Sequence, residues 1–218
     1  MILARPVTRR ELGGLGGIAL AGWGVQRLLA GGAPVGVDVG ARPIAQALLA
    51  DWSAPARDIG TPTLTVVVFT DYQCPACKLA HPALERAADA DGQVRLSYRD
   101  WPIFGPRSVR AARVAIAAAA QGVYPAVHGR LMAEARTLDE RVLREAVERS
   151  GGDWAKVVAR LRSDGAAIDA QLAETARAAF LLGLAGTPGY LIGPILVTGA
   201  LDDTGFGRAF AQAREASR

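Results

Sequence analysis

The chain has 218 residues, of which half are hydrophobic and 21% are charged, a composition typical of folded globular proteins that excludes a disordered chain. Its formal net charge is +4, and +3 of this belongs to residues 1–33. The rest of the chain is nearly neutral and lacks the basic surface that nucleic-acid binding uses. We therefore expect no nucleic-acid partner.

Residues 1–33 are predicted to be an export signal or an N-terminal anchor. Arg5, Arg9 and Arg10 precede an apolar run from Leu12 to Val25. As a helix this run would span about 21 Å, short of the roughly 30 Å of a bilayer core, so a signal sequence is favoured over a transmembrane helix. Arg9-Arg10 resembles a twin-arginine export signal. An ordinary secretory signal and an uncleaved tether in contact with the membrane stay open as alternatives, and each of them places the protein in the periplasm or otherwise outside the cytoplasm.

A strand, a helix and a second strand are predicted in succession. The β-branched run at 64–69 is typical of a strand buried on both faces. Helical spacing of apolar residues follows Pro75 and ends at Asp91-Gly92, and residues 94–98 alternate as a second strand. This order predicts a parallel βαβ unit.

The middle of the chain is predicted to be almost entirely helical. Five helices are expected at 110–121, 124–136, 138–149, 154–162 and 166–184, with Asp153 capping the fourth. A hairpin of strands at 190–192 and 195–197 and a closing helix after Asp202 complete the chain. The prediction is an α/β protein with a sheet domain at 61–107 and 185–218, a helical insertion at 108–184, and an N-terminal arm at 34–60 that carries a short helix.

The only two cysteines, Cys74 and Cys77, lie three positions apart at the start of the first long helix. A tetrahedral zinc site needs four ligands. His81 and His128 are the only histidines, their spacing is not that of a zinc motif, and no second CxxC exists, so we expect no metal. A structural disulfide is also disfavoured, because a bridge across three residues closes a loop too short to restrict the unfolded chain much.

A redox-active pair is the remaining interpretation and the one we favour. Cys74 is expected at a helix N-terminus, where free N–H groups and the helix dipole stabilise a thiolate. Pro75 suits the first helical turn because its missing N–H would have no partner there. An exported chain without other cysteines also cannot mispair this disulfide.

Three segments carry a family resemblance. FTDYQCPACK at 69–78 resembles the active-site segment of DsbA-like thioredoxin-fold oxidoreductases. YRDWPIFG at 98–105 is similar to that family's strand-and-turn segment after the first helix, and GTPGYLI at 186–192 resembles its cis-proline loop. The resemblance implies a thioredoxin-like fold in which the helical block is the family's insertion.

The resemblance also implies the roles of the site residues. Cys74 would be the exposed nucleophile that forms a mixed disulfide with a client protein, and Cys77 the resolving thiol. The Thr187–Pro188 bond would be cis and would present the Thr187 backbone to an extended client segment. Client contacts are expected at Pro75, Ala76, Thr187 and Pro188, and no cofactor is expected.

Two positions depart from the family pattern. Relatives often place a buried acid six residues before the first cysteine, where this chain has Val68, and Asp71 lies nearer the cysteines at a loop-like position. Strongly oxidising relatives have a histidine where this chain has Ala76. The resulting hypothesis is a less oxidising centre than that of the strongest relatives.

Other polar and aromatic residues have less specific interpretations. His81 shares a helix face with Cys77 and is a weak candidate for a proton relay. Arg99-Asp100 is expected to form a local ion pair. Tyr72, Trp101, Phe104 and Tyr190 are expected either to contact clients at the active-site surface or to pack in the core.

The leading functional hypothesis is an exported thiol–disulfide oxidoreductase that oxidises cysteine-containing client proteins as they fold. The resemblance implies that a membrane oxidase of the DsbB type would reoxidise it. The alternatives are a reductase or isomerase kept reduced by a membrane electron donor, and a client-binding, chaperone-like module whose thiols are incidental.

Overall fold

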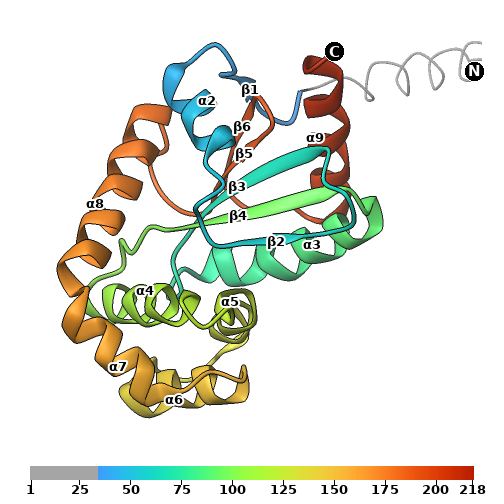
Figure 1. The fold of residues 1–218 in the computed structure, drawn as a ribbon. Helices are drawn as coiled ribbons and strands as arrows, with labels where there is room; N and C mark the ends of the chain where they lie inside the picture. The colour runs from blue at the N-terminus through green and yellow to red at the C-terminus, as the bar shows by residue number, and fades with distance from the viewer. Residues whose placement is uncertain (1–33) are drawn as a thin grey trace, which may run out of the picture. The chain divides into compact units, whose positions relative to one another are not determined.

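The computed structural model describes residues 34–218 (Figure 1). Val35–Arg218 form one compact unit, so the helical insertion packs with the sheet domain. The predicted signal or anchor, including Arg9-Arg10, lies outside the described residues. Within residues 34–218, no helix is both long and apolar enough to cross a membrane.

A six-stranded sheet forms the centre of this unit, in the order β1-β6-β5-β3-β4-β2. Its middle strands, β3 (Leu64–Thr70) and β4 (Val94–Asp100), pair in parallel and are joined by α3 (Pro75–Asp91), as the sequence predicts. The hairpin of β5 (Gly189–Ile192) and β6 (Ile195–Thr198) adds antiparallel to β3. The fold class is confirmed as α/β with a thioredoxin-like sheet.

The two edge strands were not predicted. Both β1 (Val37–Asp38) and β2 (Ala56–Asp58) belong to the segment expected to be an arm, and they pair with β6 and β4. Strands of two and three residues are too short to show an alternating pattern in the sequence. Their pairing therefore depends on the sheet that they join.

All of the predicted helices are present, with ends shifted by a few residues. Besides α3, they are α2 (Pro43–Ala50), α4 (Pro106–Ala119), α5 (Tyr124–Ala133), α6 (Glu140–Arg149), α7 (Trp154–Ser163), α8 (Gly165–Leu182) and α9 (Asp203–Ala216). The largest shift is at α4, which begins at Pro106 because proline is accepted at the first helical position. The predicted cap at Asp153 is confirmed, since its carboxylate accepts from the backbone N–H groups of Ala155 and Lys156.

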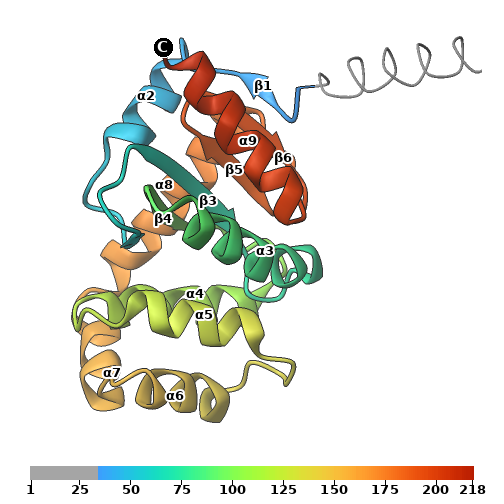
Figure 2. The same ribbon diagram turned by 90° about the vertical axis from the view of Figure 1, so that its right-hand side faces the viewer.

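The sheet separates two hydrophobic cores. On one face, Val66, Val68 and Leu96 pack under α3, α9 and the first helices of the insertion, in the core that also holds both cysteines. On the other face, Val67 and Phe69 pack under α2 and α8. Figure 2 shows α3 and α9 on one side of the strands and α2 with α8 on the other.

Candidate active site

The cysteine pair lies where β3 ends and α3 begins. Cys74 is the N-cap of α3, and its Sγ accepts the backbone N–H of Cys77 at 3.2 Å. Pro75 takes the first helical position, and the backbone N–H of Cys74 donates to the Asp71 carbonyl at 3.1 Å. The sulfur of Cys74 therefore sits at the positive end of the helix, where negative charge is stabilised.

Both thiols are free and buried, with exposed fractions of 2% for Cys74 and 3% for Cys77. The expectation of an exposed Cys74 is wrong for this structure, because the loop that carries Thr187 covers it. Burial, followed by the contact with Cys74, raises the pKa of the Cys77 thiol to about 12. Cys77 is thus held as a neutral thiol, whereas Cys74 has a hydrogen-bond donor directed at its sulfur.

The Thr187–Pro188 peptide bond is cis and lies against the cysteines. The Cys74 thiol donates to the Thr187 carbonyl with a distance of 3.4 Å from Sγ to O. β5 begins at Gly189, directly after this bond, and pairs with the end of β3 at Phe69. Sheet pairing thus brings together two segments that lie 113 residues apart in the chain.

Asp71 links the cysteine turn to a second loop. One carboxylate oxygen accepts from the backbone N–H of Gln73 at 2.7 Å and from the hydroxyl of Ser108 at 2.7 Å. The other accepts from the backbone N–H groups of Ile103 and Phe104, at 2.7 and 2.9 Å. With an exposed fraction of 1%, this carboxylate fixes the turn before Cys74 against the loop that follows β4.

Comparison with protein families identifies this arrangement. The model of the DSBA-like thioredoxin domain matches residues 65–209, a region that contains both cysteines and the cis-proline loop. The chain belongs to the DSBA-like thioredoxin family. Its members are thiol–disulfide oxidoreductases, and the resemblance seen in the sequence is confirmed.

Solved structures agree with this assignment. A thioredoxin-like oxidoreductase from Silicibacter pomeroyi DSS-3 is 34% identical, with a TM-score of 0.72 over 78% of this chain and 97% of that chain. A periplasmic thioredoxin-like protein from Salmonella enterica serovar Typhimurium is 26% identical, with a TM-score of 0.67 over 79% and 96%. The catalytic domain of Proteus mirabilis ScsC is 25% identical, with a TM-score of 0.68 over 77% and 93%. No curated protein matched the chain.

A buried polar cluster lies behind the cysteine turn of this DsbA-like protein. The Tyr124 hydroxyl donates to Asp100 Oδ2 at 2.9 Å, and the Tyr72 hydroxyl lies 3.5 Å from that of Tyr124 and 3.0 Å from His128 Nδ1. Burial raises the pKa of Asp100 to about 7 and lowers that of His128 well below its usual value. The cluster connects the cysteine turn, β4 and α5 through buried hydrogen-bonding groups.

Several sequence expectations can now be compared with this geometry. The predicted ion pair between Arg99 and Asp100 is wrong, because neighbouring residues of a strand point to opposite faces: Arg99 pairs with Asp51 at 2.8 Å, and Asp100 meets Tyr124. Tyr72 and Tyr190 are core residues, 1% and 2% exposed.

The aromatic residues of the loop that follows β4 are less deeply buried than Tyr72 and Tyr190. Phe104 is 49% exposed, and Trp101 is partly buried against the core under α8. The ring centroids of His81 and His128 are 5.1 Å apart, which places His81 at the edge of the buried cluster.

The role of Asp71 was left open by the sequence. An aspartate that accepts the N–H two residues later is a common turn feature, and Asp71-Tyr72-Gln73 fits that local pattern. Its other partners lie 32 to 37 residues away, so no local pattern could have revealed them.

We expect Asp71→Ala to destabilise the protein by roughly 3 kcal/mol, because it removes the acceptor of three partly buried backbone N–H groups and of the buried Ser108 hydroxyl. Asp202→Ala is the matched control: it removes an exposed helix cap on α9 and should cost about 1 kcal/mol. Urea unfolding of both variants measures the difference. Equal losses of stability would contradict the linking role of Asp71.

The raised pKa of Asp100 predicts an unusual pH dependence. Because the folded protein holds this proton more tightly than the unfolded chain, the stabilisation is complete below about pH 4 and is lost as the pH rises through about 7. Relative to Asp100→Asn, the wild-type protein should lose roughly 4 kcal/mol of unfolding free energy between pH 4 and 8, from about three pKa units at 1.36 kcal/mol each.

Asp203→Asn is the control for this titration. The hydrogen bond from Arg86 lowers the pKa of the exposed Asp203 carboxyl, so its contribution is present at neutral pH and is lost on acidification. Urea unfolding across the pH range measures both differences. If Asp100→Asn follows the wild type at every pH, the buried proton on Asp100 is absent.

Proposed function

We propose that the protein catalyses dithiol–disulfide exchange through Cys74 and Cys77, with Cys74 as the residue that forms the mixed disulfide and Cys77 as the resolving thiol. The observation that carries this proposal is the environment of the Cys74 sulfur. It caps α3, accepts the Cys77 N–H, and faces the Thr187 carbonyl beside the cis bond to Pro188.

The exchange proceeds in two balanced steps. A client thiolate attacks Sγ of Cys74 in the Cys74–Cys77 disulfide, which forms the mixed disulfide and releases Cys77 as a thiolate. The high pKa of Cys77 means that this sulfur takes up a proton and does not readily attack back. A second client thiolate then attacks the client's own sulfur and releases Cys74, so the client loses two electrons and the protein gains them.

Client proteins are proposed to approach along the cis-proline loop. Thr187 and Pro188, with Pro75 and Ala76 on the first turn of α3, would form the contact surface, and the Thr187 backbone would pair with an extended client segment. The side chains of Ile103 and Phe104, 44% and 49% exposed, supply apolar surface on the loop that Asp71 holds. A client must displace the contact between Cys74 and Thr187, because the thiol is covered.

The direction we propose is oxidation of folding proteins outside the cytoplasm. The basic and apolar composition of residues 1–33 supports export, by the twin-arginine route or by ordinary secretion with or without a retained tether. The similar Salmonella protein is periplasmic by name. A membrane oxidase of the DsbB type would then reoxidise the cysteines.

A reductase or isomerase is the second candidate, favoured by one observation: Ala76 provides no hydrogen-bond donor to the Cys74 thiolate. Acid quenching and alkylation of intact cells distinguish the two. Mostly oxidised cysteines support the oxidase, and mostly reduced cysteines support the reductase or isomerase.

Single cysteine variants, in the reduced form, test the exchange itself on a peptide that contains a disulfide, followed by the gain of free peptide thiols. We expect Cys74→Ser to abolish exchange and mixed-disulfide formation. In Cys77→Ser, the Cys74 thiolate should attack the peptide disulfide and release one peptide thiolate, and the mixed disulfide should accumulate because the resolving thiol is missing. Ser163→Ala, at the end of α7, is the control and should exchange normally. A Cys74→Ser protein that still exchanges would contradict the role of Cys74. One that lacks exchange but still acts on clients would instead support a chaperone-like module.

The redox potential should be more negative than about −120 mV, a value characteristic of a strong oxidant, because the Cys74 thiolate has one stabilising donor fewer. Ala76→His should shift the potential upward, by roughly 30 mV for each 1.4 kcal/mol of added thiolate stabilisation. Ala76→Leu adds bulk without a donor and should leave it unchanged. Equilibration in graded glutathione buffers measures all three, and a wild-type value at or above −120 mV would disprove the hypothesis.

A further inference from the structure

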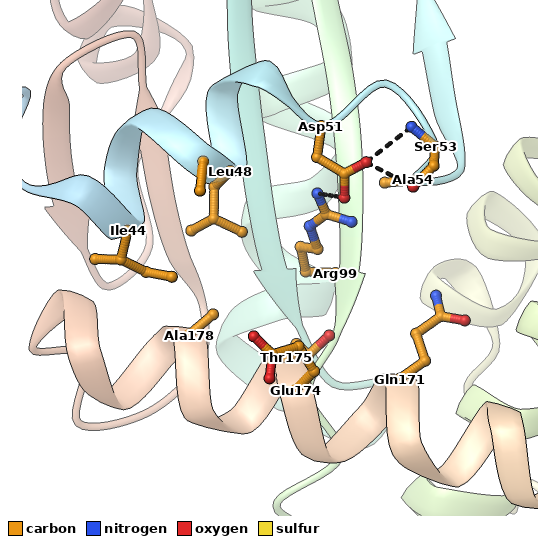
Figure 3. Close-up of a pocket in the computed structure, with 11 residues that line it drawn as sticks. Ile44, Leu48, Asp51, Ser53, Ala54, Arg99, Gln171, Glu174, Thr175 and Ala178 are labelled. Atoms are coloured by element: carbon orange, nitrogen blue, oxygen red, sulfur yellow. Dashed lines mark hydrogen bonds and ion pairs between the residues drawn. The ribbon is translucent and has the colours of Figure 1, made fainter.

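A cavity of about 300 Å³ opens on the face of the sheet opposite the cysteines. Its walls come from α2, the segment after α2, β4 and α8 (Figure 3). The volume is within the range of small-molecule sites. Nothing in the exchange chemistry at Cys74 and Cys77 uses this cavity, so it calls for a separate explanation.

Arg99 is the charged group at its centre. Its side chain is 9% exposed, and Figure 3 shows the guanidinium between Asp51 on one wall and Thr175 with Glu174 on the other. Nη2 donates to Asp51 Oδ2 at 2.8 Å. Nε is buried and has no hydrogen-bond acceptor among residues 34–218. A buried donor without an acceptor is unfavourable, so the guanidinium has unused capacity to bind one.

Each acidic residue of the cavity is already paired with an arginine. Asp51 Oδ1 accepts from the backbone N–H and the hydroxyl of Ser53, and Oδ2 accepts from Arg99. The carboxylate oxygens of Glu174 accept from Arg177 at 2.7 and 2.9 Å. A ligand therefore has to supply an acceptor for a cation, and a carboxylate is the acceptor that pairs best with a guanidinium.

The rest of the lining is largely apolar. Ile44 and Leu48 of α2 lie across from Ala178 of α8, as Figure 3 shows. These side chains lie to one side of the guanidinium. The cavity thus presents a cationic donor next to a short hydrophobic wall, which matches a molecule with a carboxylate at one end and a small apolar body.

We propose that this cavity binds a small monocarboxylate, with the carboxylate on the Arg99 guanidinium and the apolar tail between Ile44, Leu48 and Ala178. The site is independent of the cysteines, so it stands or falls separately from the proposed exchange activity. Hexanoate is the probe that has both required features. Hexylamine and hexan-1-ol have the same tail with a cationic or a neutral head.

The test is a titration of the isotope-labelled full chain, followed by the NMR shifts of backbone amides. Hexanoate should give saturable shifts at residues 44–54 and 171–178 and none at the cysteine turn. Hexylamine should give none, and hexan-1-ol should bind more weakly than hexanoate. An absence of saturable shifts, or equal binding of the amine, overturns the proposal.

Two variants test the assignment independently. Arg99→Gln removes the cation and should weaken hexanoate binding by at least about tenfold, the loss expected for a charged hydrogen bond. Ala47→Phe fills the rim of the cavity from α2, leaves the Arg99 ion pair intact, and should weaken binding similarly. Ala155→Phe places the same bulk on the exposed surface of α7 and is the control. Unchanged affinity in Ala47→Phe, or in a folded Arg99→Gln, overturns the proposal, as does an equal loss in Ala155→Phe.

Discussion

The buried carboxylate of Asp71 is the contact on which the active site depends. Four donors converge on its two oxygens: one from the turn before Cys74, two from the loop after β4, and one from α4. A carboxylate can satisfy this many donors because it has about four lone-pair sites. The turn that carries the cysteines and the loop that carries Ile103 and Phe104 consequently hold one relative position, although they belong to different crossovers of the sheet.

This fixed position accounts for the chemical asymmetry of the two cysteines. Cys74 is placed at the first turn of α3, where a backbone N–H is directed at its sulfur, whereas burial raises the pKa of Cys77 to about 12. The helix start and the sheet pairing that brings Thr187 to Cys74 set this difference. Val68 adds no charge to this environment, because it is an apolar residue buried in the core opposite Tyr190.

The sequence predicted the site well where local patterns determine it. The run at 64–69, Pro75 after Cys74, and Gly92 at the end of α3 each have a local cause, and the strand, helix and caps follow from them. The sequence could not predict contacts made only by the assembled fold. The partners of Asp71 on the loop after β4 and on α4, the pairing of Arg99 with Asp51 and the two short edge strands all depend on residues more than 15 positions away.

Strand alternation explains why Arg99 and Asp100 serve different parts of the molecule. Asp100 points to the face with the cysteines, where burial holds its proton and Tyr124 donates to it. Arg99 points to the other face, where its guanidinium pairs with Asp51. Two adjacent residues with opposite formal charge therefore do not neutralise each other. One supplies a buried acid with a raised pKa behind the active site, and the other places a guanidinium under α2 and α8, so the end of β4 contributes to both faces of the sheet.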